Sequence, residues 1–346
     1  MTVPSPGMGS PLVVWGAGAM GGSVGAALVR TGFDVLFVDK VPEHVTAMNE
    51  RGLRITGPVD EYVVPVRAKM PDEVSGEFHS VFLCVKAQHT REAAEQLKPV
   101  LAEDGAIVSI QNGLCEVEIA EVVGPDRTVG AFVNFGADYL EPGVIHRGNR
   151  GATVVGEIDG SITDRSRKLH SVLQAFEPDA VLTDNIFGFL WGKLAYASLL
   201  FATALTDESI ADVLAEPRHR PAMIALAREA VGVALKRGIA LEGFDGFDPR
   251  AFTPGMADSA AHSSLDDLVA FNRASAKSHS GIWRDLAVRK RPTEVDAQLG
   301  WIVREGEALG IDTPLTASLI RQIHEIEAGR LSHRWENLDT LFETLR

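Results

Sequence analysis

Short apolar runs alternate with helix-like stretches along the first half of the chain. The apolar runs have the length and the β-branched composition of buried strands. They cover residues 12–15, 34–38, 81–85 and 106–110. A helical pattern covers residues 90–101, between the third and the fourth run. This alternation predicts a doubly wound parallel sheet, so the expected fold class is α/β with a Rossmann-type first domain.

Three further strand-like segments follow, with glycine turns between them. They cover residues 128–135, 143–147 and 152–156. Because tight turns join antiparallel strands, these segments predict an antiparallel extension of the same sheet. A helical pattern over about residues 164–176 is expected to close this domain.

The second half of the chain has helical periodicity without convincing strands. The helical stretches cover residues 187–204, 217–237, 275–287, 293–309 and 314–328. We therefore expect a dinucleotide-binding domain over residues 12–184 and an all-helical substrate and dimerisation domain over residues 185–346. Residues 1–11 are rich in Pro, Gly and Ser and are expected to form a disordered tail.

The first strand runs directly into a Gly-x-Gly-x-x-Gly turn made by Gly16, Gly18 and Gly21. Between a strand and a helix, this spacing is a dinucleotide-binding fingerprint: the first glycine makes the turn, the second lets the backbone approach a pyrophosphate, and the third lets the helix pack on the strand. The alternative is that the glycines serve only a tight turn. Asp39 ends the next strand, where an acid binds ribose hydroxyls, so NAD is the expected cofactor; the neighbouring Lys40 leaves room for NADP.

Composition and charge exclude several classes of partner. The chain has 346 residues, 45% of them hydrophobic, and a formal net charge of −14, whereas binding to a phosphate backbone needs clustered Lys and Arg. No stretch reaches the ~20 apolar residues of a membrane span. The two cysteines, Cys84 and Cys115, form neither a disulfide framework nor a metal-ligand cluster. We expect a cytoplasmic protein with no metal site and no nucleic-acid or membrane partner.

Two polar side chains directly follow expected parallel strands. Lys86 follows the run 81–85, and Asn112 follows the run 106–110. Ligands of open α/β sheets bind at the carboxyl ends of the strands, so we expect these side chains to contact the cofactor and the substrate. The alternatives are a solvated lysine and an ordinary Asn-Gly turn.

A lysine and a glutamate in the second half are candidates for catalysis. Lys193 lies within a strongly apolar helical stretch, and a partly desolvated ammonium group is suited to donate a proton to a carbonyl oxygen. Snorkelling of this side chain to the surface is the alternative. Glu294 follows the cap-like Thr293, so it could also be a first-turn acid favoured by the helix dipole.

Five ordered motifs together resemble the ketopantoate reductase family. They are Gly16-Ala-Gly-Ala-Met-Gly21, Cys84-Val-Lys86-Ala, Gln111-Asn-Gly113, Trp191-Gly-Lys193-Leu and Arg291-Pro-Thr-Glu294-Val-Asp296. The resemblance implies reduction of a 2-keto acid by a nicotinamide hydride, with Lys193 as the proton donor. It further implies that Asn112 binds cofactor and substrate, that Glu294 anchors both, and that Lys86 contacts the cofactor. The cofactor contacts expected in all are Gly16, Ala17, Gly18, Ala19, Met20, Gly21, Asp39, Lys40, Lys86, Asn112, Gly136 and Glu294.

The chain departs from the family where the substrate is expected. Ala197 stands in place of an asparagine four residues beyond the lysine, and Leu200 and Phe201 stand on the next turn in place of a second amide. The family's Ser-Ser-Met stretch reads Ser280-Gly-Ile-Trp283 here. A more apolar pocket is therefore expected, which discriminates against a substrate hydroxyl. The expected substrate contacts are Lys193, Ser198, Ser278 and Ser280, and Lys277 offers a further polar group.

Three hypotheses follow from these residues. The first is a 2-dehydropantoate 2-reductase-like oxidoreductase that works in a cleft between its domains, within pantothenate biosynthesis, and forms a homodimer. The second is a family member that acts as an NAD-dependent dehydrogenase on a different hydroxy acid. The third is a dinucleotide-binding sensor without turnover, against which the presence of both Lys193 and Glu294 argues.

Overall fold

The computed structural model describes residues 11–274 and 278–343. The chain divides into two compact units, Met1–Ile186 and Phe187–Arg346, two residues beyond the predicted boundary. The expected tail, apart from residue 11, lies outside the described residues, as does Lys277.

The first unit is built on an eight-stranded sheet in the order β12-β11-β8-β7-β6-β1-β2-β5. Its strands are β1 Leu12–Trp15, β2 Val35–Val38, β5 Arg67–Lys69, β6 Phe78–Leu83, β7 Leu101–Ser109, β8 Thr128–Val133, β11 Thr153–Glu157 and β12 Val181–Leu182. Neighbouring strands are parallel from β8 through β7, β6, β1 and β2 to β5, whereas β11 runs antiparallel to β8. The predicted doubly wound sheet and its antiparallel extension by residues 152–156 are confirmed. Residues 128–135 were expected to belong to the antiparallel part as well, but β8 is parallel to β7.

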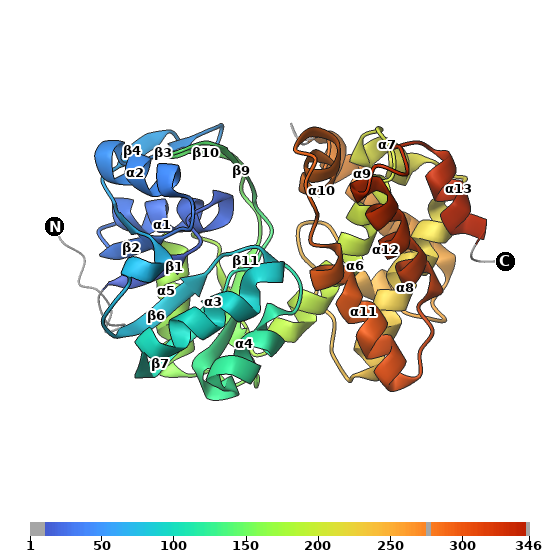
Figure 1. Cartoon of the computed structure of the whole chain (residues 1–346). Helices are drawn as coiled ribbons and strands as arrows, with labels where there is room; N and C mark the ends of the chain where they lie inside the picture. Colours follow the sequence, from blue (N-terminus) through green and yellow to red (C-terminus); the bar gives the residue numbers. More distant parts are fainter. Residues whose placement is uncertain (1–10, 275–277, 344–346) are drawn as a thin grey trace. The chain divides into compact units, whose positions relative to one another are not determined.

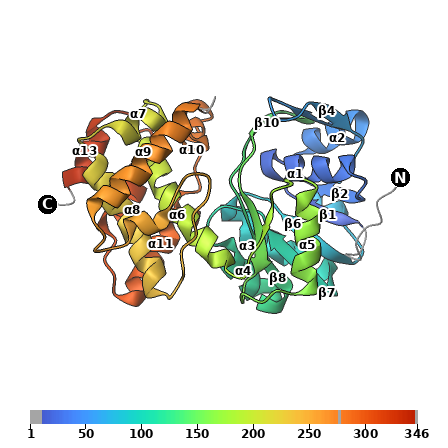
Figure 2. The same cartoon turned by 180° about the vertical axis from the view of Figure 1, so that it is seen from behind.

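Helices cover both faces of this sheet (Figures 1 and 2). They are α1 Ala19–Arg30, α2 Pro42–Arg51, α3 Thr90–Leu97, α4 Cys115–Val123 and α5 Asp164–Gln174. Alternate strand residues such as Val14 and Phe37 share one buried core with α1 and α5. The helix expected over 90–101 stops at Leu97, because Pro99 cannot continue it and Leu101 already begins β7.

A second, four-stranded sheet lies against α1 and corrects one prediction. Its order is β4-β3-β10-β9, with β3 Leu53–Thr56, β4 Tyr62–Val64, β9 Gly136–Glu141 and β10 Val144–Asn149. Residues 143–147 were expected to extend the main sheet, but β10 pairs with β3 and β9 instead. The packing explains this, because a Cβ on Gly22 of α1 would lie 2.1 Å from the Cδ1 atom of Ile145 in β10.

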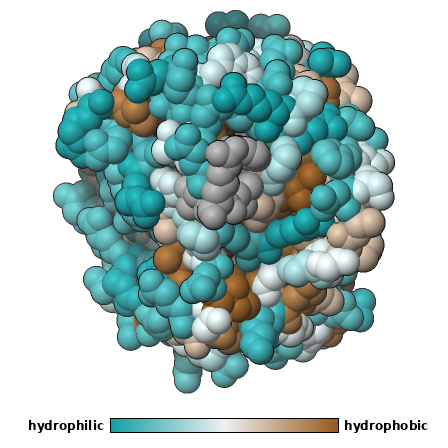
Figure 3. All heavy atoms as spheres, turned by 90° about the vertical axis from the view of Figure 1, so that its right-hand side faces the viewer, coloured by the Kyte–Doolittle hydropathy of each residue, from teal (hydrophilic) through white to brown (hydrophobic). Residues whose placement is uncertain are grey.

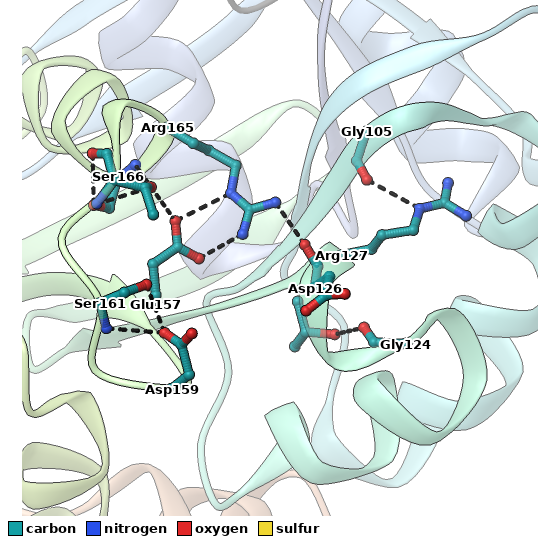
Figure 4. A network of polar contacts seen from close by, with 11 residues as sticks. Gly105, Gly124, Asp126, Arg127, Glu157, Asp159, Ser161, Arg165 and Ser166 are labelled. Carbon is teal, nitrogen blue, oxygen red and sulfur yellow. Dashed lines mark hydrogen bonds and ion pairs between the residues drawn. The ribbon is translucent and has the colours of Figure 1, made fainter.

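The amino-terminal edge of the main sheet is tied together by polar contacts (Figure 4). The Nη2 atom of Arg165 lies 2.5 Å from the buried carboxylate of Glu157, and Nη1 donates to the carbonyl of Asp126 at 2.7 Å. Arg127 donates to the carbonyl of Gly105 at 3.2 Å. A buried carboxylate needs such a partner, so these residues serve the fold at this edge.

The second unit is helical over its described residues, apart from one isolated bridge between Phe244 and Phe247. Its helices are α6 Ile186–Thr203, α7 Ile210–Ala215, α8 Arg220–Lys236, α9 Asp258–Ala274, α10 Gly281–Trp283, α11 Val295–Leu309, α12 Pro314–Glu327 and α13 Glu336–Glu343. The all-helical second domain is confirmed, and α8 packs against α9, α11 and α12. The helix expected over 275–287 is reduced, in the described part, to α10 and a π-helical turn at Arg284–Val288.

Helix α6 is the one helix among the described residues with the length and apolarity to cross a membrane. Of its residues, 78% are buried inside the structure. Its apolar character is therefore explained by its place in the protein core. On the molecular surface, apolar side chains gather in separate areas of a mainly hydrophilic face (Figure 3).

Candidate active site

The three glycines of the turn after β1 are required for different reasons. Gly16 has a φ of +98°, and a Cβ there would lie 2.8 Å from the amide nitrogen of Val85. A Cβ on Gly21 would lie 2.1 Å from the carbonyl oxygen of Gly16. In contrast, a Cβ on Gly18 would meet nothing within 4 Å, and the φ of this residue is an ordinary −66°. Packing accounts for the first and third glycines, while the open space at Gly18 is what a closely approaching ligand needs.

The amino terminus of α1 offers backbone donors at the same place. Gly18 is the N-cap and provides no side-chain cap, and the first turn contains no acidic residue. The first amide groups of a helix have no intrahelical acceptor, and the helix dipole favours negative charge there. These features fit the diphosphate of a dinucleotide, held by the backbone of Gly18, Ala19 and Met20.

Asp39 follows β2 and holds the glycine turn. Its Oδ2 atom accepts a hydrogen bond from the amide of Ala17 at 2.8 Å, and its Oδ1 atom accepts one from the amide of Val41 at 3.0 Å. An ionised carboxylate has about four lone-pair sites, so two backbone bonds leave capacity for ribose hydroxyls. The half-buried position of Asp39 at the carboxyl edge of β2 therefore fits the predicted ribose contact.

Basic side chains lie beside Asp39 on the same edge. The Nζ atom of Lys40 lies 3.4 Å from the Nε2 atom of His89. His89 follows Lys86 in the turn after β6, and its amide donates to the carbonyl of Lys86 at 2.8 Å. Lys40 and Lys86 are both exposed. This edge thus carries a carboxylate, which favours NAD, and lysine side chains, which favour NADP.

Asn112 follows β7, one strand further along this edge. It is half-buried, and Gly113 turns the chain with a φ of +89°. The preceding Gln111 is buried and donates from Nε2 to the carbonyl of Val85 and to the hydroxyl of Thr90, both at 2.9 Å. Gln111 therefore fastens the segment that carries Asn112 to the segment that carries Lys86.

Gly136 begins β9 of the second sheet, where it pairs with Asn149 of β10. A Cβ on Gly136 would lie 2.2 Å from the Oδ1 atom of Asn149. Gly136 thus packs closely on the side chain of Asn149, and its predicted cofactor contact has no separate support from the geometry.

Lys193 lies in the middle of α6, on a side of this helix that is not fully buried. It is half-buried, as are Phe189 one turn before it and Leu200 two turns after it. Ala197, between them on the same side, is 6% exposed. The ammonium group thus belongs to a stripe whose other members are apolar, which is the environment predicted for a proton donor.

Glu294 is held in place at the start of α11. It is the N-cap residue and is only 8% exposed. The amide and the hydroxyl of the preceding Thr293 both donate to the Oε1 atom of Glu327 at 2.7 Å. Before it, Arg291 makes an ion pair of 2.9 Å with Asp285. The segment that leads into Glu294 is therefore held by side chains from two other segments.

A histidine connects Glu327 to α11. The Nδ1 atom of His324 lies 2.9 Å from Glu327, and its Nε2 atom lies 3.1 Å from Asp296. Burial alone would lower the pKa of His324, but the bonds to these two carboxylates raise it above its ordinary value. Burial would likewise raise the pKa of Glu327, but the bonds from Thr293 and His324 lower it. His324 and Glu327 are thus stabilised in their charged forms.

The serines predicted to contact the substrate have structural partners. Ser198 is fully buried and donates to the carbonyl of Ala195 at 2.7 Å, so the fold already uses its hydroxyl. Ser280 is buried and caps α10 by accepting from the amide of Trp283 at 3.1 Å. Ser278 is exposed, with its hydroxyl 2.8 Å from His279. Phe201, expected to line the pocket, is fully buried and belongs to the core.

The predicted catalytic residues are divided between the two units. Asn112 and the residues of the glycine turn belong to the first unit, whereas Lys193 and Glu294 belong to the helical unit. The helical unit also has a cavity of about 780 Å³, lined by Leu235, Pro254 and their neighbours. None of the predicted site residues lines it.

Sequence reasoning missed residues that hold this site. His44, Gln111 and Glu327 all bond to the backbone of segments that carry predicted site residues. A histidine or a glutamate on a helix carries no local signal of such a bond, because its partner is distant in the sequence. Only Gln111 had a signal, since it lies inside one of the five motifs.

Comparisons with known proteins agree with these motifs. The family model for "Ketopantoate reductase PanE/ApbA" matches residues 12–160, and the model for its C-terminal domain matches residues 185–327. The 2-dehydropantoate 2-reductase of Streptococcus pyogenes serotype M6 is 24% identical over 315 residues, which are 90% of this chain and 96% of the relative.

Solved structures have the same fold over nearly the whole chain. A PanE/ApbA family ketopantoate reductase from Ralstonia eutropha JMP134 is 26% identical, with a TM-score of 0.76 over 92% of this chain and 99% of its own. A D-mandelate dehydrogenase, solved with NADH and anilino(oxo)acetate, is 21% identical, with a TM-score of 0.80 over the same shares. The two family models together cover most of the chain, and so the chain belongs to the ketopantoate reductase family of nicotinamide-dependent oxidoreductases.

Proposed function

We propose that this enzyme reduces the carbonyl group of a 2-keto acid to the 2-hydroxy acid, with NADH as the preferred reductant. The observation that carries the proposal is Lys193, a half-buried ammonium group on the apolar stripe of α6. The glycine turn, Asp39 and Asn112 supply the matching cofactor side in the first unit.

The chemistry follows from what each group can donate. A bound reduced nicotinamide supplies a hydride to the carbonyl carbon. Lys193 donates a proton to the carbonyl oxygen, so that the developing alkoxide becomes a hydroxyl group. Asn112 donates and accepts hydrogen bonds to orient the two reactants, and Glu294 accepts from hydroxyl groups of the bound ligands.

Asp39 supports a preference for NAD over NADP. Its carboxylate accepts hydrogen bonds from a ribose diol and repels a 2′-phosphate. Lys40, with His89 beside it at 3.4 Å, would favour the phosphorylated form. We place Asp39 first because it is fixed against Ala17 in the turn itself, whereas Lys40 is exposed and its charge is screened by solvent.

The apolar stripe on α6 favours a substrate other than ketopantoate, which is the second candidate function. Ala197 and Leu200 provide no hydrogen bond for a hydroxyl group. A buried hydroxyl without a partner weakens binding by about 1–3 kcal/mol. We therefore propose that a bulkier, more apolar 2-keto acid, or the corresponding hydroxy acid oxidised with NAD, is the preferred substrate.

Initial rates with a panel of acids and both cofactors test this proposal. The panel contains ketopantoate, pyruvate, 2-ketoisovalerate and phenylglyoxylate, with the matching hydroxy acids in the oxidative direction. We expect turnover with at least one member and a higher kcat/KM for an apolar acid than for ketopantoate. No turnover with any acid and either cofactor would refute the proposed function, whereas a clear preference for ketopantoate would refute only the substrate assignment.

The expected homodimer and the cytoplasmic location stay predictions. Light scattering coupled to gel filtration measures the first directly. A mass close to twice the 37.2 kDa of one chain is expected.

A further inference from the structure

His44 connects the glycine turn to the second sheet through two backbone hydrogen bonds. It lies in the first turn of α2 and is fully buried. Its Nε2 atom lies 2.9 Å from the carbonyl oxygen of Ala17, and its Nδ1 atom lies 2.9 Å from the amide nitrogen of Gly143, in the turn between β9 and β10. No motif and no predicted role includes this residue.

The two partners determine the form of the ring. The carbonyl of Ala17 can only accept a hydrogen bond, and the amide of Gly143 can only donate one. The Nε2 atom of His44 is therefore the donor and Nδ1 the acceptor, so the imidazole is neutral. Tyr139 packs against the ring edge-to-face, with a centroid distance of 5.0 Å.

These bonds determine the direction of the peptide between Ala17 and Gly18. In a trans peptide, the carbonyl of one residue and the amide of the next point in opposite directions. Because His44 holds the carbonyl of Ala17, the amide of Gly18 points away from His44. A Cβ on Gly18 would meet no atom within 4 Å, so the surroundings of this residue are open. The amide of Ala17 is held as well, because it donates to Asp39 at 2.8 Å.

We propose that His44 is a positioning residue for the dinucleotide: it fixes the Ala17–Gly18 peptide before the cofactor binds, so that the Gly18 amide is aimed at the diphosphate. A turn that is already ordered loses less conformational entropy on binding. The proposal rests on the proposed cofactor site and adds a residue that acts on it through the backbone.

Two substitutions separate the two bonds of His44. The amide oxygen of asparagine is as far along the side chain as Nδ1, so His44→Asn keeps an acceptor for Gly143 and loses the donor to Ala17. The amide nitrogen of glutamine is as far along as Nε2, so His44→Gln keeps the donor to Ala17. Asn49, on the same helix, provides a matched control because it bonds to both the amide and the carbonyl of Ala68 in β5, at 2.9 Å each.

The test measures the Kd of NADH and of NADPH by nicotinamide fluorescence, with the melting temperature of each variant. We expect His44→Asn to raise both Kd values at least tenfold, and His44→Gln to keep them within about threefold of wild type. Asn49→Ala should lower the melting temperature and leave both Kd values unchanged. Equal Kd values for wild type and both His44 variants, equal losses in both, or a loss only in His44→Gln would each overturn the proposal.

Hydrogen exchange on the wild-type protein provides a second readout that needs no variant. We expect the amides of Gly16 and Ala17, which donate to the carbonyl of Val38 and to Asp39, to exchange slowly even without cofactor, while the Gly18 amide becomes protected only when the cofactor binds. Fast exchange at Gly16 and Ala17 that becomes slow only with NADH would overturn the proposal even if His44→Asn failed to fold. If wild type bound neither cofactor, the proposed function would fail, and the exchange rates would still decide whether the turn is ordered in advance.

Discussion

Replacing Gly18 by alanine separates cofactor binding from folding. The new Cβ would have no neighbour within 4 Å, and the φ of −66° at this position suits alanine. The fold therefore gives no reason for a glycine here. If the open space is occupied by the cofactor diphosphate, the methyl group stands where that diphosphate must approach.

Two opposing effects set the stability of Gly18→Ala. Removing a glycine restricts the unfolded chain, which stabilises the fold by about 0.4–1 kcal/mol. Alanine is a poorer N-cap than glycine, by an amount of about 1 kcal/mol at most. We therefore expect the free energy of unfolding to change by less than about 1 kcal/mol. The Kd for NADH should rise at least tenfold, or by about 1.4 kcal/mol.

Gly21→Ala is the matched variant with the opposite expectation. Its Cβ would lie 2.1 Å from the carbonyl oxygen of Gly16 and 2.8 Å from the Cβ of Cys84. Overpacking of this kind costs on the order of 1–3 kcal/mol or more. Each kcal/mol of lost stability lowers the melting temperature by about 2–4 °C, so the melting temperature of Gly21→Ala should fall by several degrees.

Thermal unfolding with and without NADH, together with fluorescence titration, measures both quantities in each variant. A Gly18→Ala variant that binds NADH and NADPH with the wild-type Kd would refute the reasoning, since the open space would then not be the diphosphate site. A large loss of stability in Gly18→Ala would refute the packing argument.

Two further predictions concern charged groups. Asp39→Asn removes the repulsion of a 2′-phosphate, so kcat/KM for NADPH should rise at least tenfold relative to kcat/KM for NADH. A wild-type enzyme that already prefers NADPH tenfold would contradict this role of Asp39. Because the pKa of His324 is raised from 6.5, its bonds to Glu327 and Asp296 stabilise the fold fully below pH 6.5 and lose this contribution as the pH rises through the folded-state pKa. The melting temperature should therefore fall as the pH rises above about 6.5, and His324→Gln should flatten this profile. An identical profile in the variant would disprove the assignment.

The sequence predicted the parts of the fold that depend on local patterns. The run of residues 12–15, the glycine turn and the apolar helix around Lys193 are each defined by neighbours in the chain, and all three have the predicted structure. The second sheet was missed because β3 and β10 pair across about ninety residues, as in Ile55 with Ile145. Such pairing depends on tertiary packing against α1, which leaves no periodicity in the sequence.

The site could be predicted where chemistry requires an unusual residue. A lysine in an apolar helix and a glycine triplet are both costly without a function, so they are visible in the sequence. Phe201 was assigned to the pocket by its spacing from Lys193, and Ser198 as a nearby hydroxyl, but the structure buries both. Residues at the same spacing along α6 differ in exposure because neighbouring segments cover most of this helix.

The measurement that tests the central claim most directly is the turnover of Lys193→Ala with the best 2-keto acid of the panel. The account predicts that kcat falls by about two to four orders of magnitude, the usual loss for a general acid, while the Kd of NADH stays within about threefold of wild type. Lys236→Ala, which removes an exposed lysine from α8 of the same unit, should leave kcat unchanged. A folded Lys193→Ala variant with a kcat within about threefold of wild type would contradict the account, because the proton would then come from another group.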